Sequence, residues 1–191
     1  MILWHFPQVG KGKAFKPAYD SIEWRKDNGE FERWCNGQTG YPIVDAGMRE
    51  LAATGYMQNR ARMIVAMYLI YHLRLDWRLG EIHFALHLTD YDYCNNLGGW
   101  LWCAGWEVYS NDWFRPFSMH SQMMRFDADA KYVHQWCPEL KNVEPRDLYN
   151  WASNADAMRE KYPKIQYARS IIPDLDSARG DGIAMYKRAH T

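Results

Sequence analysis

Polar side chains that could bind a ligand lie close together near the middle of the chain, beside a pair of glycines. They are Asp90, Asp92, Asn95 and Asn96, followed by Gly98 and Gly99. Such carboxylates and amides can cap helices or ligate a cation, but the DxDxDG spacing and the final Glu of a calcium loop are absent. Capping explains single members of the cluster. It does not explain all of them beside glycines that let a backbone approach a flat or bulky group.

An arginine upstream needs a partner that this cluster can supply. Arg62 lies in an apolar segment, where a guanidinium is costly to leave unpaired. Asp90 or Asp92 is the available carboxylate, and Asn59 and Met63 share the side of the helix on which Arg62 lies. Such a pair is equally consistent with a structural ion pair and with part of a ligand site.

The elements that must position these residues are predicted to be helices, so the fold class is all-α. Residues 59–73 are apolar on almost every side and predict a buried helix. Further helices are expected over 30–34, after an N-cap at Asp45, over 80–88, and near 130–137, 145–159 and 176–189. Residues 7–20 are expected to form a loop, and 89–99 a polar glycine-containing connection.

Composition narrows the class of protein. The 191 residues include 10 Trp and 13 Tyr, a density that suits core filling or planar and redox-active partners. The formal net charge of zero argues against a general nucleic-acid binder, so DNA binding needs a local basic patch. The cysteines are scattered without metal-ligand spacing, and no metal site is expected. No apolar run is long enough to span a membrane, which favours a soluble intracellular protein, in cytoplasm or nucleus.

Several segments, in order, resemble the photolyase and cryptochrome family. Residues 34–49 resemble its WxxGxTGYPxVDAxMR signature, 54–60 its TGWMHNR segment, and 76–81 its DWRxGE motif. Residues 90–102 resemble DxDxxxNNGGWQW, and 126–140 resemble FDPxGxYIxxWxPEL. The similarity is firmest over 15–140 and weaker to the C-terminus, so residues 1–191 are expected to form a single, partial FAD-binding domain.

This resemblance implies an all-helical bundle that holds FAD beside DNA. Matching by motif assigns the flavin contacts to Asn59, Arg62, Asp90, Asp92, Asn96 and Trp100. Arg62 and Asp90 are then the ion pair beside the ring, and Asn96 faces flavin N5. Asn at that position is typical of repair members, which favours a photolyase.

The same matching assigns an electron-transfer chain and a lesion pocket. Trp100 is expected nearest the flavin, then Trp77, and then Trp24 at the surface, because indoles are readily oxidised. Met63 and Trp102 match positions that line the pocket for a flipped pyrimidine dimer, and Arg115 belongs to the family's YFR segment, with an expected DNA contact. Asn59 and Gln58 are assigned to catalysis, although Gln58 replaces the pocket His of the family motif.

The resemblance also implies what this sequence lacks. The antenna domain and the first part of the flavin domain have no counterpart here, so no antenna chromophore is expected on this chain. The prediction is a split or truncated deoxyribodipyrimidine photolyase, an FAD-dependent carbon–carbon lyase acting on damaged DNA, with a second polypeptide as a possible source of the missing part. The alternatives are a blue-light-sensing cryptochrome and a non-catalytic scaffold that binds a partner.

Overall fold

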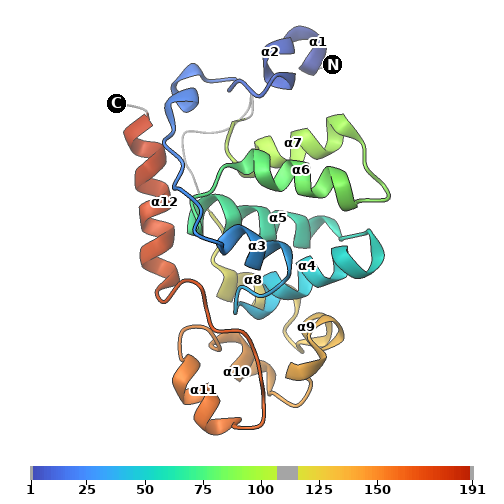
Figure 1. Cartoon of the computed structure of the whole chain (residues 1–191), viewed down its shortest axis with the longest axis vertical. Coiled ribbons are helices and arrows are strands. Elements are labelled where there is room, and N and C mark those ends of the chain that lie inside the picture. The colour runs from blue at the N-terminus through green and yellow to red at the C-terminus, as the bar shows by residue number, and fades with distance from the viewer. Residues whose placement is uncertain (1, 107–115, 190–191) are drawn as a thin grey trace.

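A computed structural model describes residues 2–106 and 116–189, and within these ranges the chain forms helices and turns without a strand (Figure 1). The all-α prediction is therefore confirmed. The elements are α1 (Ile2–His5), α2 (Pro7–Gly10), η1 (Pro17–Ser21), α3 (Glu30–Cys35), α4 (Pro42–Thr54), α5 (Asn59–Met67), η2 (Tyr68–His72), α6 (Trp77–His87), α7 (Tyr93–Cys103), α8 (Met119–Phe126), α9 (Lys131–Trp136), η3 (Pro138–Leu140), α10 (Pro145–Tyr149), α11 (Ala155–Lys161) and α12 (Leu175–Ala189).

The helices stack in layers around α5. The neighbouring α6 and α7 lie on one side of α5 and α4 lies on the other, with α9 packed against α4 (Figure 1). The long helix α12 runs along the edge of these layers and packs against η2, the π-helical turn that continues α5. The residue Gly182 makes this contact possible, because a Cβ there would lie 2.2 Å from the Tyr71 carbonyl oxygen.

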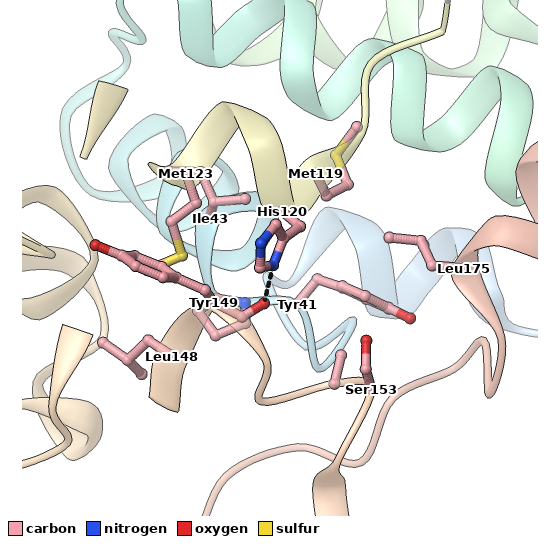
Figure 2. Close-up of a pocket in the computed structure, with 11 residues that line it drawn as sticks. Tyr41, Ile43, Met119, His120, Met123, Leu148, Tyr149, Ser153 and Leu175 are labelled. Carbon is pink, nitrogen blue, oxygen red and sulfur yellow. Dashed lines mark hydrogen bonds between the residues drawn. The ribbon is translucent and has the colours of Figure 1, made fainter. Parts of the chain in front are cut away.

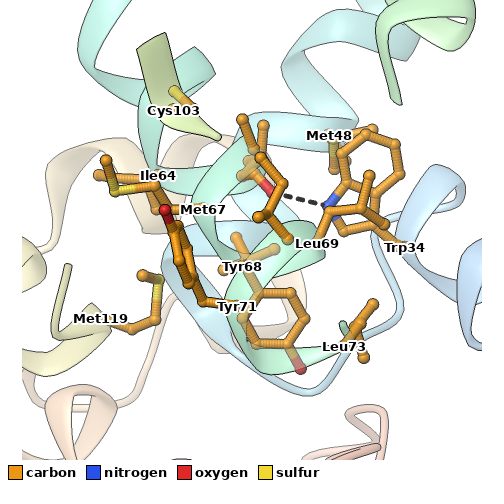
Figure 3. Packing of buried hydrophobic residues seen from close by; sticks show 14 of the residues in the cluster. Trp34, Met48, Ile64, Met67, Tyr68, Leu69, Tyr71, Leu73, Cys103 and Met119 are labelled. Atoms are coloured by element: carbon orange, nitrogen blue, oxygen red, sulfur yellow. Dashed lines mark hydrogen bonds between the residues drawn. The ribbon is translucent and has the colours of Figure 1, made fainter. Parts of the chain in front are cut away.

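The core is built around α5 and η2, as the apolar sequence predicts. Ile64, Val65 and Leu69 are almost completely buried, and Trp34 of α3 lies beside Leu69 and Met48 (Figure 3). The Trp34 indole N–H donates a 3.0 Å hydrogen bond to the Val65 carbonyl oxygen. Helix α5 and the π-turn together cover residues 59–72 of the predicted 59–73 segment, and the regular α-helix ends at Met67.

The prediction that Asp45 caps a helix is wrong. Helix α4 begins three residues earlier, at Pro42, whose fixed φ suits the first turn. The Asp45 carboxylate is instead fully buried and accepts hydrogen bonds from the Thr39 N–H (2.7 Å), the Gly40 N–H (3.1 Å) and the Tyr167 hydroxyl. It thus ties the preceding loop and the distant C-terminal segment to α4.

Other boundaries also differ from the predictions. The expected 89–99 connection is short, because α7 starts at Tyr93 and includes Asn95, Asn96 and both glycines. Helix α6 starts at Trp77 rather than near residue 80, because the Asp76 carboxylate accepts a 3.0 Å hydrogen bond from the Arg78 N–H and caps it. The predicted 7–20 loop contains α2 and η1, each of which begins at a proline, and α8 was not predicted.

No helix in the described part of the chain has both the length and the apolar character that crossing a membrane requires.

Burial of His72 makes the fold sensitive to acid. Burial lowers the pKa of His72 to about 4, aided by Arg179 and opposed by the Met67 carbonyl and Asp176. Between pH 6.5 and 4 the unfolded chain binds a proton that folded His72 does not, so the free energy of unfolding falls as pH falls, by about 1.4 kcal/mol per pH unit from this group. We expect His72→Gln to flatten this dependence in urea denaturation measured across that range. An equal slope in wild type and variant would contradict the assignment.

Candidate functional site

An ion pair joins the start of α5 to the segment before α7. One terminal nitrogen of Arg62 lies 2.8 and 3.0 Å from the two carboxylate oxygens of Asp90. The Arg62 Nε donates to the Met57 carbonyl oxygen at 2.6 Å, so the guanidinium is held from two sides. The structure thus selects Asp90 rather than Asp92 as the partner of Arg62.

Asp92 and Gln58 do not take part in this ion pair and lie at the starts of helices. The Asp92 carboxylate accepts a 2.8 Å hydrogen bond from the Asn95 N–H and caps α7. The Gln58 side-chain oxygen accepts a 2.8 Å hydrogen bond from the Arg60 N–H and caps α5. Both residues are exposed, and their side chains set where the two helices begin.

A cavity of about 320 Å³ lies between these helices. It is lined by the predicted site residues Asn59, Arg62, Met63, Asn96 and Trp100, together with Ala66, Phe84, Asn95, Gly99 and Cys103. Residues 59, 62, 63 and 66 of α5 follow the i, i+3, i+4, i+7 spacing, and so do residues 96, 99, 100 and 103 of α7. This spacing was the signal for Ala66 and Cys103, which sequence reasoning missed, because it places them on the facing sides of α5 and α7. Phe84, also missed, belongs to α6 and lies outside this pattern.

Asn96 is fixed in one orientation. It is buried, and its amide nitrogen donates to the Glu81 carbonyl oxygen (3.1 Å) and to the Glu81 carboxylate (3.0 Å). Both partners are acceptors, so the amide nitrogen must face Glu81 and the amide oxygen remains as an acceptor for another group. Glu81 was not predicted as part of the site.

The glycines of α6 and α7 differ in their surroundings. A Cβ on Gly98 or Gly99 would meet nothing within 4 Å, so the backbone here is open to a ligand. A Cβ on Gly80 would lie 2.0 Å from the Trp100 ring. Trp100 therefore packs directly on the backbone of α6, and its edge also contacts Phe84 at a centroid distance of 5.1 Å.

The other predicted tryptophans lie away from the cavity lining. Trp77 is buried at the start of α6, and its ring contacts Trp106 at a centroid distance of 5.5 Å. Trp24 is half-buried and contacts Tyr186 at 6.3 Å. Trp102 is 45% exposed on α7, one residue from the cavity-lining Cys103. The predicted DNA contact Arg115 lies outside the described residues.

A second cavity, between α4, α8 and α10, is much smaller (Figure 2). Its volume of about 30 Å³ has room for one or two water molecules. The imidazole of His120 approaches the Tyr149 carbonyl oxygen at 3.1 Å here, on the far side of α4 from the first cavity. None of the predicted site residues lines it, and it is not a candidate ligand site.

Comparison with known proteins relates this architecture to one family. Residues 1–188 match the family described as the FAD binding domain of DNA photolyase. The chain is 38% identical over 98% of its length to a deoxyribodipyrimidine photo-lyase of Neurospora crassa, of which it covers 31%.

Solved structures agree with this relationship. The chain superposes with a TM-score of 0.88 on a class III photolyase from Agrobacterium tumefaciens, at 39% identity, covering 99% of this chain and 39% of that one. It superposes with a TM-score of 0.85 on an archaeal photolyase from Sulfolobus tokodaii containing two FAD molecules, at 36% identity, covering 98% of this chain and 41% of that one. The chain thus spans 31% to 41% of the length of these relatives.

The close approach of Gly80 and Trp100 yields a stability prediction. Gly80→Ala forces the buried indole to move, and overpacking of this kind costs about 1–3 kcal/mol of unfolding free energy. Gly98→Ala is the matched control, since a helical Gly→Ala change with free space adds about 0.5–1 kcal/mol. Urea denaturation of the ligand-free chain measures both, and equal effects of the two substitutions would contradict the packing described.

Proposed function

The chain belongs to the FAD-binding domain family of DNA photolyases, and on this premise we propose that it forms part of a flavin-dependent, light-driven deoxyribodipyrimidine photolyase. The observation that carries the proposal is the cavity between α5 and α7, where the held guanidinium of Arg62 and the fixed amide of Asn96 face one space. A scaffold that only bound a partner protein has no need for this arrangement.

The chemistry of the lining fits a flavin ring. The free amide oxygen of Asn96 is an acceptor, and the reduced isoalloxazine carries an N–H donor at N5. Arg62, neutralised in part by Asp90, supplies donors for the polar edge of the ring, Asn59 lies beside it, and Gly99 leaves room for a planar group. The cavity volume is at the low end of the 300–1,000 Å³ typical of small-molecule sites, so it suits one part of FAD.

The predicted site residues have different roles in this proposal. Bound reduced FAD supplies, on absorbing light, the electron that splits the cyclobutane ring of the dimer. Met63 and the exposed face of Trp102 offer apolar and aromatic surface on which an extruded dimer can stack, and Arg115 contacts the DNA. Asp92 and Gln58 contribute by fixing the starts of α7 and α5.

The tryptophans keep the flavin reduced in this proposal. Trp100 lines the cavity, and Gly80 places its ring against α6, whose first residue is Trp77. Trp24 is half-buried, so it can exchange electrons with a solution reductant. The proposed order of electron donation is Trp24 to Trp77 to Trp100 to the flavin.

The cavity predicts both flavin binding and repair. We expect the chain, together with the rest of a photolyase, to bind FAD and to remove cyclobutane dimers from an oligonucleotide only in light. Arg62→Gln removes a charged donor and is expected to weaken FAD binding about tenfold to a hundredfold, equivalent to about 1.4–2.8 kcal/mol. Flavin absorbance titration and a dimer-loss assay measure the two effects.

The control for this experiment is Arg159→Gln, which breaks a surface ion pair with Asp156 (3.1 Å) outside the cavity. It should leave FAD affinity unchanged. A wild-type chain that is colourless both alone and together with the rest of a photolyase would favour the scaffold alternative. Flavin photoreduction without dimer loss would favour a blue-light sensor.

We propose further that α6 docks the part of a photolyase that this chain does not span, in the same or a second polypeptide. Leu79, Ile82 and Leu86 share one face of α6 and are 39%, 52% and 76% exposed. Exposed apolar groups of this kind, clustered on one element, are typical of interaction surfaces. The relatives' additional length supplies a suitable occupant.

Charge placed on this face should prevent assembly. We expect Leu86→Lys to abolish co-purification with the remaining residues of the Agrobacterium photolyase expressed as a separate chain, because a buried unpaired ammonium is costly. Met124→Lys is the control, since Met124 is 49% exposed on α8. Undiminished co-purification of the Leu86 variant would refute the docking face without affecting the flavin assignment.

A further inference from the structure

Trp106 is an indole that sequence matching did not assign to any role. Trp106 follows α7 after Gly105, whose φ of 67° turns the chain, and its backbone N–H donates to the Leu101 carbonyl oxygen at 2.9 Å. Trp106 and Trp77 are 1% and 2% exposed, and their rings meet edge to face, with an interplanar angle of 73°. The two indoles are therefore in direct contact inside the protein.

One cation acts on both indoles equally. The guanidinium carbon of Arg78 lies 4.8 Å from the centroid of the Trp77 ring and 4.9 Å from that of Trp106. The group is held by the Asp76 carboxylate (3.0 Å) and by the Gly12 carbonyl oxygen. A positive charge makes removal of an electron from a nearby ring harder, and at equal distances it does so to a similar extent for each ring. The electrostatic environment therefore favours similar oxidation potentials for the two indoles.

Neither indole N–H has a proton acceptor beside it in the part of the chain that the structure describes. The Nε1 atoms of Trp77 and Trp106 are buried and have no hydrogen-bond partner among the described residues, in contrast to that of Trp34. An oxidised indole is trapped as a neutral radical when its N–H proton leaves. Since no acceptor is in place among the described residues, we expect an electron vacancy on either ring to stay a radical cation that can move to the other.

We propose that Trp106 is a fourth redox-active indole, which exchanges one electron with oxidised Trp77. The inference rests on the proposed function, which supplies the oxidant: one electron leaves Trp100 for photoexcited oxidised FAD, and one leaves Trp77 for Trp100. Trp106 then gives one electron to the Trp77 radical cation and becomes a radical cation itself, with its Nε1 proton retained. Electron return from Trp24, or from a thiol reductant, restores Trp106.

The experiment isolates Trp106 by removing the competing donor. Nanosecond transient absorption of the FAD-loaded protein, assembled with the rest of a photolyase, follows the tryptophan radical cation after a light pulse. In Trp24→Phe we expect a long-lived radical-cation component, because the vacancy is shared between Trp77 and Trp106. In Trp24→Phe/Trp106→Phe we expect loss of that component.

The matched control is Trp24→Phe/Trp151→Phe, since Trp151 is equally buried but contacts Tyr162 and Tyr167 elsewhere in the chain. It should keep the component. A third variant, Trp24→Phe/Arg78→Gln, leaves both indoles in place and should lengthen the radical lifetime, because a cation that disfavours the vacancy is removed.

The outcomes separate the two proposals. If the Trp106 variant retains the component, or if the Arg78 variant shortens it, the fourth indole is refuted while the flavin assignment stands. If the wild-type assembly binds no FAD, both the proposed function and the electron exchange between Trp106 and Trp77 that depends on it are refuted. Flavin absorbance of each variant before the pulse shows that the site is assembled.

Discussion

The site depends on helix α5, which is apolar on the side packed into the core and polar on the side that lines the cavity. Most of the helix is packed into the core, yet one face carries Asn59 and Arg62, whose polar groups cannot be buried without partners. The bond from Arg62 to Asp90 meets this need and at the same time ties the start of α5 to the segment that leads into α7. Because the pair is partly exposed, its energetic contribution to folding is modest, and its main effect is to hold the guanidinium in one place.

Helix caps give the site its register. Asp76, Asp92 and Gln58 each accept a backbone N–H at the first turn of α6, α7 and α5. A cap decides the residue at which a helix begins, and thereby the direction of every side chain that follows at helical spacing. Acidic and amide residues that look like ligands in the sequence thus act indirectly on the cavity. They fix the helix starts, and the helix starts orient Asn96, Trp100 and Arg62 toward the cavity.

Close packing of aromatic rings has a second consequence here. Gly80 brings Trp100 against α6, and the turn at Gly105 brings Trp106 against Trp77. Contacts that fill the core also supply the short distances between oxidisable rings that electron exchange requires. The same Arg78 that holds Asp76 and Gly12 lies over both indoles, so one side chain contributes to the start of α6 and to the electrostatics of the pair.

The sequence alone determined the helical class, the buried character of residues 59–73, the need of Arg62 for a carboxylate and the family resemblance. The first three follow from local spacing and from the cost of an unpaired charge, and the resemblance follows from the order of matching motifs; none of them needs knowledge of the fold. The resemblance already implied Asp90 as the carboxylate partner of Arg62, and the structure confirms the pair. Only the tertiary structure decided that Asp45 is a buried acceptor for Thr39 and Tyr167, and that Trp106 touches Trp77. Each of these depends on which distant segments meet, and a hydrogen bond or ring contact between segments far apart in sequence leaves no periodic signal along the chain.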